Sequence, residues 1–225
     1  MSSAGTGNSH DKDAAQYDRQ AREHGCHAHE ALFGMMYEFV SPGETLLDMG
    51  IGTGLGSILF HKMGLHVSGF DSSSGMLAMC EAKGFAAQLV QHDLQDVPFP
   101  YPATSFNHVI SLSVLHFFAD LAPVFEETAR IIKPRGVFGF TVEEQKPGQR
   151  AEYVIRIDGG PDRPAQEAVV NMHRHGDTHV RYLLAGNGFT PLKSFEFFAD
   201  RHPTEERNIY FKAYVARKVE FSNTK

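Results

Sequence analysis

The sequence predicts an α/β fold, a doubly wound and mostly parallel sheet of seven strands that ends in an antiparallel hairpin. Short apolar segments alternate with amphipathic segments from residue 45 to residue 142, which is the rhythm of strands and covering helices. A glycine-rich turn directly follows the first of these strands. The length of 225 residues suits one domain better than two.

The chain begins with a polar stretch and then turns helical. Residues 1–12 are rich in Ser, Gly and Asn, which predicts a disordered tail before a single domain over residues 13–225. Apolar residues recur at helical spacing between Ala14 and Val40, and a Ser-Pro-Gly sequence then ends the run. We expect residues 13–40 to form a helical lid at the edge of the sheet.

The remaining elements follow from changes of period and from the glycines and prolines between them. Strands are expected at 45–48, 66–70, 87–90, 108–112, 136–142, 191–198 and 209–216. Helices are expected at 55–63, 74–83, 124–132 and 179–186. The short polar loop between the last two strands favours an antiparallel hairpin. Residues 143–176 interrupt the alternation, so we expect them to form an insertion that caps the carboxyl end of the sheet.

Composition excludes several function classes. The chain has 21 Lys and Arg against 27 Asp and Glu, a net charge of −6, so nucleic acid is not an expected partner. The polar start argues against a signal peptide, and no segment approaches the roughly 18 apolar residues that cross a bilayer. The only cysteines are Cys26 and Cys80, which favours a reducing compartment. We expect a cytoplasmic monomer or homodimer that binds no membrane.

The strongest local signal is the turn Asp48-Met49-Gly50-Ile51-Gly52-Thr53-Gly54 between a strand and a helix. Glycines allow a sharp turn and close approach of a ligand, and the free N–H groups of the helix suit a carboxylate or a phosphate. No frame fits the dinucleotide pattern G-x-G-x-x-G, because the third position falls on Leu55, Ser57 or Leu59. The spacing therefore argues against a nicotinamide-dependent reductase.

Two further acids come after the next two strands. Asp71 ends the second strand, where a carboxylate can accept hydrogen bonds from both hydroxyls of a ribose. Asp93 follows the third strand, where it can accept from an exocyclic amine while its neighbour Leu94 packs on a base. Each acid alone is more typical of a solvated loop. Together with the glycine turn they predict a site at the carboxyl ends of the first strands.

Five motifs in order resemble the class I S-adenosylmethionine-dependent methyltransferases, in the broad small-molecule branch that includes the quinone-biosynthesis type. They are LLDMGIGTG at 46–54, FDSSSGML at 70–77, HDL and VPF within 92–99, SFNHVIS at 105–111 and ARIIKPRG at 129–136. Asn107 stands where an acid is usual, and Arg135 where glycine is common. The resemblance implies a Rossmann-like fold with S-adenosyl-L-methionine as cofactor.

The resemblance also implies roles for individual residues. The cofactor-binding set is Tyr17, Asp48, Gly50, Gly52, Gly54, Asp71, Ser72, Met76, Asp93, Leu94 and Ser111. Gly50, Gly52 and Ser111 would meet the methionine part of the cofactor. Ser72 and Met76 would flank the adenine, and Tyr17 would close over the site.

The sequence determines the catalytic group less sharply. Methyl transfer is an in-line displacement in which alignment and desolvation can supply much of the acceleration. A base is needed only if the acceptor must lose a proton, and His116, just beyond the fourth strand, is the candidate. A packing or helix-cap histidine is the alternative. The chain lacks the Asn-Pro-Pro-Tyr or Asp-Pro-Pro-Tyr motif, which argues against methylation of amino groups in DNA bases or glutamine. The resemblance implies a small-molecule acceptor, with oxygen, nitrogen, sulfur and metalloid atoms all open.

Two histidine-rich segments allow other interpretations. Cys26, His27 and His29 form one, and His173, His175 and His179 form the other, in which the last two could share a helix face. No carboxylate cluster supports a metal site, so none is expected.

The residue ranges 13–40 and 143–176 flank the expected site, and we hypothesise that they form a mobile lid over the transferring methyl group. Static cover of the sheet is the alternative for both. For the whole chain, the alternative to an enzyme is a degenerate methyltransferase fold that acts as a cofactor-binding or scaffold protein.

Overall fold

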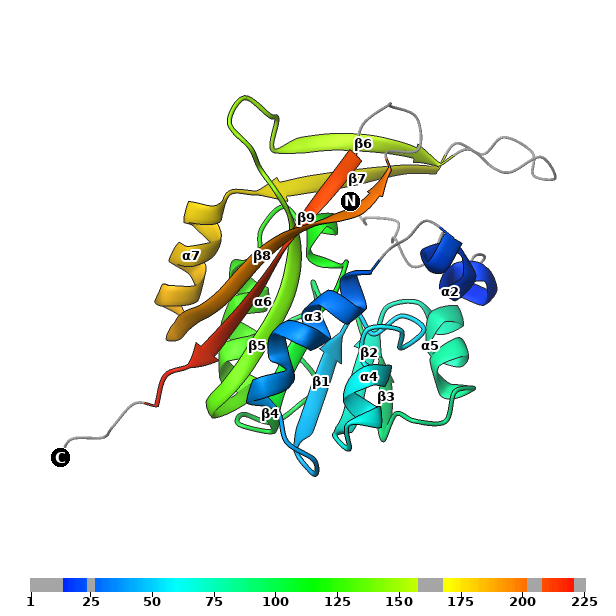
Figure 1. Cartoon of the computed structure of the whole chain (residues 1–225), viewed down its shortest axis with the longest axis vertical. Helices are drawn as coiled ribbons and strands as arrows, with labels where there is room; N and C mark the ends of the chain where they lie inside the picture. Colours follow the sequence, from blue (N-terminus) through cyan, green and yellow to red (C-terminus); the bar gives the residue numbers. More distant parts are fainter. Residues whose placement is uncertain (1–13, 24–26, 158–167, 202–207, 221–225) are drawn as a thin grey trace.

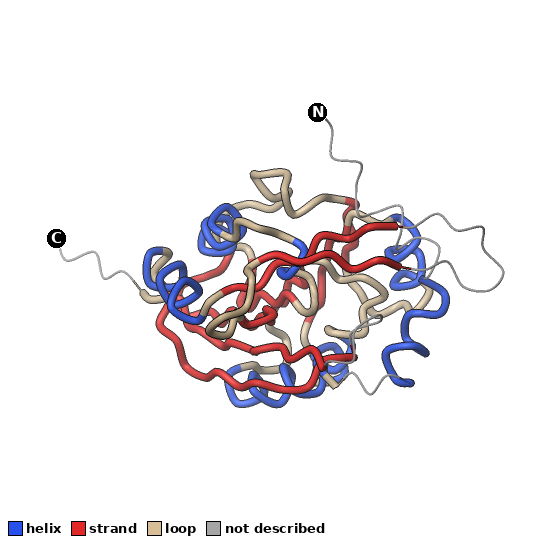
Figure 2. Tube along the Cα trace, turned by 90° about the horizontal axis from the view of Figure 1, so that it is seen from above, coloured by secondary structure: helices blue, strands red, loops and turns tan. Residues whose placement is uncertain are grey.

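The structure, a computed structural model, describes residues 14–23, 27–157, 168–201 and 208–220. The tail predicted over residues 1–12 lies outside these ranges. A central sheet separates two groups of helices, with α3 and α4 in front of it and α6 behind it in Figure 1. Seen from above in Figure 2, helices flank the strands on both sides.

The described strands reproduce the expected α/β alternation. They are β1 (Thr45–Met49), β2 (His66–Asp71), β3 (Gln88–Gln91), β4 (Phe106–Ser111), β5 (Ile132–Glu144), β6 (Glu152–Ile157), β7 (Ala168–His175), β8 (Phe189–Arg201) and β9 (Asn208–Lys218). The first five pair in parallel in the order β3-β2-β1-β4-β5. β9 then pairs antiparallel with β5, and β8 with β9. The predicted doubly wound sheet with its terminal hairpin is confirmed.

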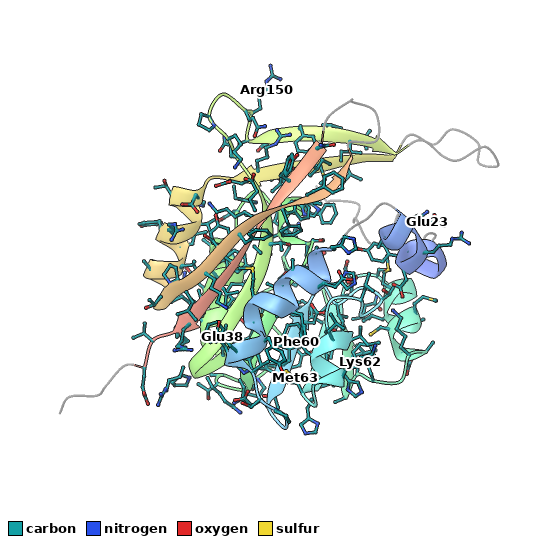
Figure 3. The ribbon with its side chains drawn as sticks, in the orientation of Figure 1. Glu23, Glu38, Phe60, Lys62, Met63 and Arg150 are labelled. Atoms are coloured by element: carbon teal, nitrogen blue, oxygen red, sulfur yellow. The ribbon has the colours of Figure 1, made fainter. Side chains whose placement is uncertain are left out.

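Helices cover both faces with apolar side chains. They are α2 (Ala14–Glu23), α3 (Ala28–Met36), α4 (Ile58–Lys62), α5 (Ser74–Glu81), α6 (Ala122–Ile131) and α7 (Asp177–Gly186), with short 3₁₀ helices η1 (Tyr37–Phe39) and η2 (Leu115–Phe117). On one face α6 buries Phe125 and Ile131 in a cluster that α7 joins through Leu184. On the other face Phe60 of α4, labelled in Figure 3, packs edge-on against Phe33 of α3. No described helix could serve as a transmembrane segment.

Three expected helix boundaries are corrected. The run over 14–40 is divided into α2, α3 and η1, with residues 24–26 outside the described part of the chain. The helix expected from residue 55 begins at Ile58, and residues 55–57 form a turn that extends the glycine-rich loop. α6 ends at Ile131, since Ile132 is already extended two residues before a proline that disfavours helical backbone ahead of it.

The segment 143–176 adds the antiparallel pair β6–β7, which runs across the top of Figure 1. The described sheet therefore has nine strands, where seven were expected. β7 pairs in parallel with Glu143 and Glu144 of β5. β9 occupies the opposite edge of β5 at Glu143, so β7 takes the edge that β4 leaves after Ser111. The β6–β7 pair thus lies beyond the carboxyl end of β4.

A buried ionic cluster fastens β6–β7 to the sheet. The guanidinium of Arg174 donates to Glu143 at 2.7 Å and lies 4.0 Å from the centre of the Tyr153 ring. The hydroxyl of Tyr153 also donates to Glu143, at 2.5 Å. In contrast, the side chain of Arg150 at the tip of the preceding loop points away from the molecule (Figure 3). Because Glu143 and Arg174 are both buried, breaking this cluster would leave a charge without compensation.

Candidate functional site

A cavity of about 290 Å³ opens where β1 lies between β2 and β4. The turns after β1, β2, β3 and β4 line it, together with α2, α3 and the adjoining ends of β8 and β9. This is the point at which the strand order reverses direction, and ligands of open α/β sheets bind at such points. The site predicted at the carboxyl ends of the first strands therefore corresponds to a real cavity.

The turn after β1 brings bare backbone to the cavity. Gly50 has φ +73°, and a Cβ there would lie 2.6 Å from a methyl group of Val114. Gly52 has φ +53°, and a Cβ there would meet no atom within 4 Å. Since Gly52 lines the cavity, that open space is the space a ligand would fill. Glycine is required at both positions, by contact at the first and by backbone conformation at both.

Asp48, the last-but-one residue of β1, is a buried carboxyl group that faces the cavity. Loss of hydration, and to a smaller extent the nearby charge of Asp71, raise its pKa to about 7. Its Oδ1 atom accepts no hydrogen bond from the described residues. A cationic ligand group at this place would satisfy that oxygen and favour the ionised carboxylate.

Asp71 connects the turns after β1 and β2. Its Oδ2 accepts the N–H of Gly52 at 2.8 Å, and its Oδ1 accepts the N–H of Ser73 at 2.9 Å. A carboxylate can accept several hydrogen bonds at once, so this group can also accept from the hydroxyls of a ligand in the cavity. The geometry fits a ribose.

The part of the cavity near β3 and α5 suits a nucleobase. Asp93 accepts the N–H of Gln95 at 2.9 Å and keeps acceptor capacity toward the cavity. Leu94 and Met76 are buried and line the same space, and Ser72 lies beside them. The Ser73 side chain caps α5 by accepting the N–H of Met76 at 3.1 Å, which fixes the position of that methionine.

The loop after β4 forms the opposite side of the cavity in a strained conformation. Ser113 has φ +57°, and its N–H donates to the buried hydroxyl oxygen of Thr141 in β5 at 2.8 Å. His116 in η2 is 5% exposed and lies between two aromatic rings, with centroid distances of 4.3 Å to Phe117 and 4.9 Å to Phe211. Left-handed backbone at a non-glycine residue costs free energy, so the Thr141 bond helps to hold the loop in this form.

His175 supports the same loop from β7 without lining the cavity. Its Nε2 lies 3.3 Å from the carbonyl oxygen of Leu115, the residue before His116. Burial lowers the pKa of His175, so the ring is neutral at pH 7 and donates through an Nε2–H. None of the described residues of 143–176 lines the cavity, so this described part of the segment affects it through neighbours such as η2.

α2 crosses the cavity and is fastened on two sides by Asp18. One carboxylate oxygen accepts the hydroxyl of Thr53 in the glycine turn at 2.5 Å. The other accepts the ammonium group of Lys83 after α5 at 2.5 Å. Tyr17, the neighbour of Asp18, lines the cavity.

Most of the predicted site residues meet at this cavity. Those that line it are Tyr17, Asp48, Gly50, Gly52, Asp71, Ser72, Met76, Asp93, Leu94 and His116. Gly54 does not, because its Cα hydrogen faces the side chains of Phe85 and Cys80. Ser111 is fully buried, and its hydroxyl donates to the carbonyl of Met49, which joins β4 to β1.

Sequence reasoning missed a group of apolar residues that also line the cavity. They are Leu112, Val114, Phe117, Phe118, Ala199 and Phe211. Nothing in the sequence indicates that the ends of β8 and β9, which carry Ala199 and Phe211, reach the cavity.

The histidine-rich segments do not form one site. No three candidate metal ligands come together within the described residues, and Cys26 lies outside them. His29 lines the cavity, whereas His27 is exposed. The shared helix face expected for His175 and His179 is wrong, because His175 ends β7 and α7 begins only at Asp177.

Comparisons with known proteins agree with this site. Residues 47–140 match the sequence model of a family described as a methyltransferase domain. Malonyl-(acyl-carrier protein) O-methyltransferase of Serratia marcescens is 33% identical over 112 residues, which are 50% of this chain and 42% of that protein. The chain thus spans less than half the length of that relative.

Two solved structures share the fold. A methyltransferase in complex with the Haloferax volcanii Trm112 methyltransferase activator has a TM-score of 0.73 at 18% identity, over 97% of this chain and 100% of that chain. Magnesium protoporphyrin IX methyltransferase from Synechocystis with bound SAH has a TM-score of 0.59 at 14% identity, over 97% and 89%. The family match over residues 47–140, the shared fold and the groups that line the cavity all support a methyltransferase domain that uses S-adenosylmethionine.

Proposed function

We propose that the chain transfers a methyl group from S-adenosylmethionine to a small-molecule acceptor. The observation that carries the proposal is the cavity itself, in which bare backbone at Gly52, a buried carboxyl group at Asp48 and the carboxylates of Asp71 and Asp93 converge. When bound, S-adenosylmethionine supplies an electrophilic methyl group on a sulfonium sulfur. Its ammonium group, ribose and adenine each find a complementary group in this cavity.

The proposed roles follow from position along the cavity edge. Asp48 would accept from the ammonium group, because its buried Oδ1 has no hydrogen-bond donor among the described residues. Asp71, whose carboxylate lines the cavity at the end of β2, would accept from the ribose hydroxyls. Asp93 would accept from the adenine amine, with Met76 and Leu94 against the ring.

The transfer step requires alignment above all. A lone pair of the acceptor attacks the methyl carbon, the carbon–sulfur bond breaks, and its electron pair remains on sulfur. Where the attacking atom carries a proton, we assign the proton to His116, which is buried, lines the cavity and follows β4. The aromatic rings around it exclude water from the reaction.

The N-terminal helices serve as the lid in this proposal. Tyr17 of α2 and His29 of α3 line the cavity, and Asp18 fastens α2 to the glycine turn. Hydrogen exchange with and without S-adenosylhomocysteine tests this role. Protection should rise in residues 14–23 more than in 122–131, and equal changes in both ranges would mean static cover.

The named acceptors of the similar proteins differ. The Serratia marcescens relative acts on a malonyl-(acyl-carrier protein), and the Synechocystis neighbour on magnesium protoporphyrin IX. They favour methyl transfer in general and do not agree on an acceptor, which is expected when one fold serves many reactions.

Two measurements test the proposed function in sequence. Isothermal titration should first give micromolar affinity for S-adenosylmethionine and S-adenosylhomocysteine. Incubation with methyl-labelled S-adenosylmethionine and pooled metabolites should then move label into an acceptor. Absence of heat with both ligands in folded protein would refute the enzyme assignment, whereas binding without any labelled product would favour a cofactor-binding scaffold.

A further inference from the structure

The cavity has a second side that the cofactor groups leave unassigned. It consists of Val114, His116, Phe117, Phe118, Ala199 and Phe211, which we call the aromatic wall. These residues come from the loop after β4 and from the ends of β8 and β9, whereas the carboxylates come from β1, β2 and β3 or the turns after them. Val114 packs against Gly50, so the wall begins directly beside the turn assigned to the methionine part.

Rings dominate this wall and are ordered by one another. The His116 ring is tilted against Phe117 on one side and Phe211 on the other. Phe211 in turn receives the edge of Phe197, at a centroid distance of 6.4 Å. A flat aromatic ligand can make offset or edge-on contacts with such rings, which a saturated ligand of equal size cannot make as well.

Charge is distributed unevenly over the cavity. Among the described lining residues the acids are Asp48, Asp71 and Asp93, and there is no lysine or arginine. An acceptor that carries a phosphate or a carboxylate would lose its hydration at the aromatic wall without gaining a cation in this part of the chain. The wall therefore favours a neutral ligand.

From these observations we propose that the methyl acceptor is a neutral, flat aromatic molecule that lies against the aromatic wall, with its nucleophilic atom toward Gly50. This inference rests on the proposed function, because the bound molecule is a methyl acceptor only if the chain transfers methyl groups. Binding measurements alone can test which class of ligand the aromatic wall accepts, so this test is independent of the test of methyl transfer.

Calorimetry with three probes of related skeleton tests the ligand class, on protein with and without S-adenosylhomocysteine. The probes are 1-naphthol, its charged counterpart 1-naphthyl phosphate and its saturated counterpart decahydro-1-naphthol. We expect 1-naphthol to bind about tenfold more tightly than either counterpart, which corresponds to about 1.4 kcal/mol. Equal or tighter binding of the phosphate or of the saturated alcohol, or no binding of 1-naphthol, would overturn the inference.

Two variants locate the binding. Phe211→Leu keeps an apolar side chain and removes the ring, so 1-naphthol should bind about three- to tenfold more weakly while S-adenosylhomocysteine affinity stays unchanged. Tyr210→Leu is the matched control, because Tyr210 precedes Phe211 on β9, is 45% exposed and does not line the cavity. Equal effects of the two variants on 1-naphthol would place the probe elsewhere and refute the aromatic wall. If wild-type protein does not bind S-adenosylhomocysteine but Phe211→Leu still weakens 1-naphthol binding, the methyl-transfer function is refuted and the inferred ligand class is retained.

Discussion

The two sides of the cavity are built in opposite ways. The cofactor side uses backbone and carboxylates at the ends of adjacent parallel strands, and Asp71 joins two of its turns by hydrogen bonds to Gly52 and Ser73. The aromatic wall uses side chains from η2, β8 and β9, which are distant in sequence and meet only through packing. Local bonding makes the first side specific for one ligand, whereas the second can change its ligand by exchanging side chains.

The largest expected effect comes from filling the open space at Gly52. Gly52→Val should weaken S-adenosylhomocysteine binding by at least about 100-fold, because the side chain occupies cavity space on strained backbone. Gly84→Val is the matched control, with φ +66° and no atom near its Cβ, away from the cavity. Both variants should lose about 1–2 kcal/mol of unfolding free energy. Calorimetry measures the affinities and chemical denaturation measures the stabilities. Similar S-adenosylhomocysteine affinities of the two variants would contradict a ligand contact at Gly52.

The second-largest effect is expected from removing the carboxylate of Asp71. Asp71→Ala should lower S-adenosylhomocysteine affinity about 100-fold, because ribose contacts and the bond to the Gly52 N–H are lost together. Asp96→Ala, an exposed carboxylate close in sequence that does not line the cavity, should leave affinity unchanged. A loss below about threefold for Asp71→Ala in calorimetry would rule out the proposed ribose contact.

The Asp48 carboxyl group predicts a pH dependence on the cofactor side. Its pKa of about 7 means that it is mostly protonated at pH 6 and mostly ionised at pH 8. If the ammonium group binds the ionised form, S-adenosylhomocysteine affinity should rise about tenfold over this interval. Asp48→Asn should make S-adenosylhomocysteine affinity independent of pH over this interval. An unchanged pH dependence in that variant would rule out the contact between Asp48 and the ammonium group.

The same group affects folding with the opposite sign. Its pKa is raised above the unfolded value, so the ligand-free native state retains a proton that the unfolded chain releases. The free energy of unfolding of the ligand-free protein should therefore fall as pH rises from about 4 to about 7. Asp48→Asn should remove that part of the slope, which denaturant titrations at several pH values can measure.

A smaller effect is expected where β5 supports the loop that carries the aromatic wall. Thr141→Val removes the acceptor of the Ser113 N–H and should cost about 1–2 kcal/mol of stability. 1-Naphthol should bind about threefold more weakly, with S-adenosylhomocysteine affinity unchanged. Thr128→Val is the control, since that buried hydroxyl donates within its own helix, to the carbonyl of Val124. If both variants leave 1-naphthol affinity intact, Thr141 has a structural role only.

The smallest effect is expected at the lid. Lys83→Met removes one of the groups that bind the Asp18 carboxylate, and the side chains of this ion pair are about one quarter exposed. Partly exposed ion pairs contribute about 0–1 kcal/mol, so S-adenosylhomocysteine affinity should fall about twofold or threefold. Hydrogen exchange should rise in residues 14–23 and stay constant in 122–131. Faster exchange without any change in affinity would mean that α2 covers the cavity without contributing to binding.

The cofactor side of the cavity could be predicted from sequence, whereas the aromatic wall could not. Asp48, Gly52, Asp71 and Asp93 could be found from sequence, because each lies at or just after the carboxyl end of a strand, and in a parallel sheet these ends share an edge. Gly54 and Ser111 carry equally strong motif signals but serve the packing of α5 and the junction of β4 with β1. A motif gives sequence position, and burial decides which of its members face the ligand.

The sequence by itself determined the alternation of strands and helices and the cofactor edge, because periodicity and glycine spacing are local properties of the chain. Only the tertiary structure decided that β7 lies beyond the end of β4, that His175 supports Leu115, and that Phe211 reaches the cavity. The contacts of His175 with Leu115 and of Phe211 with His116 join residues 60 or more positions apart, so they depend on how the hairpins pack against the sheet. No local pattern encodes that packing, which is why the acceptor side became visible only in three dimensions.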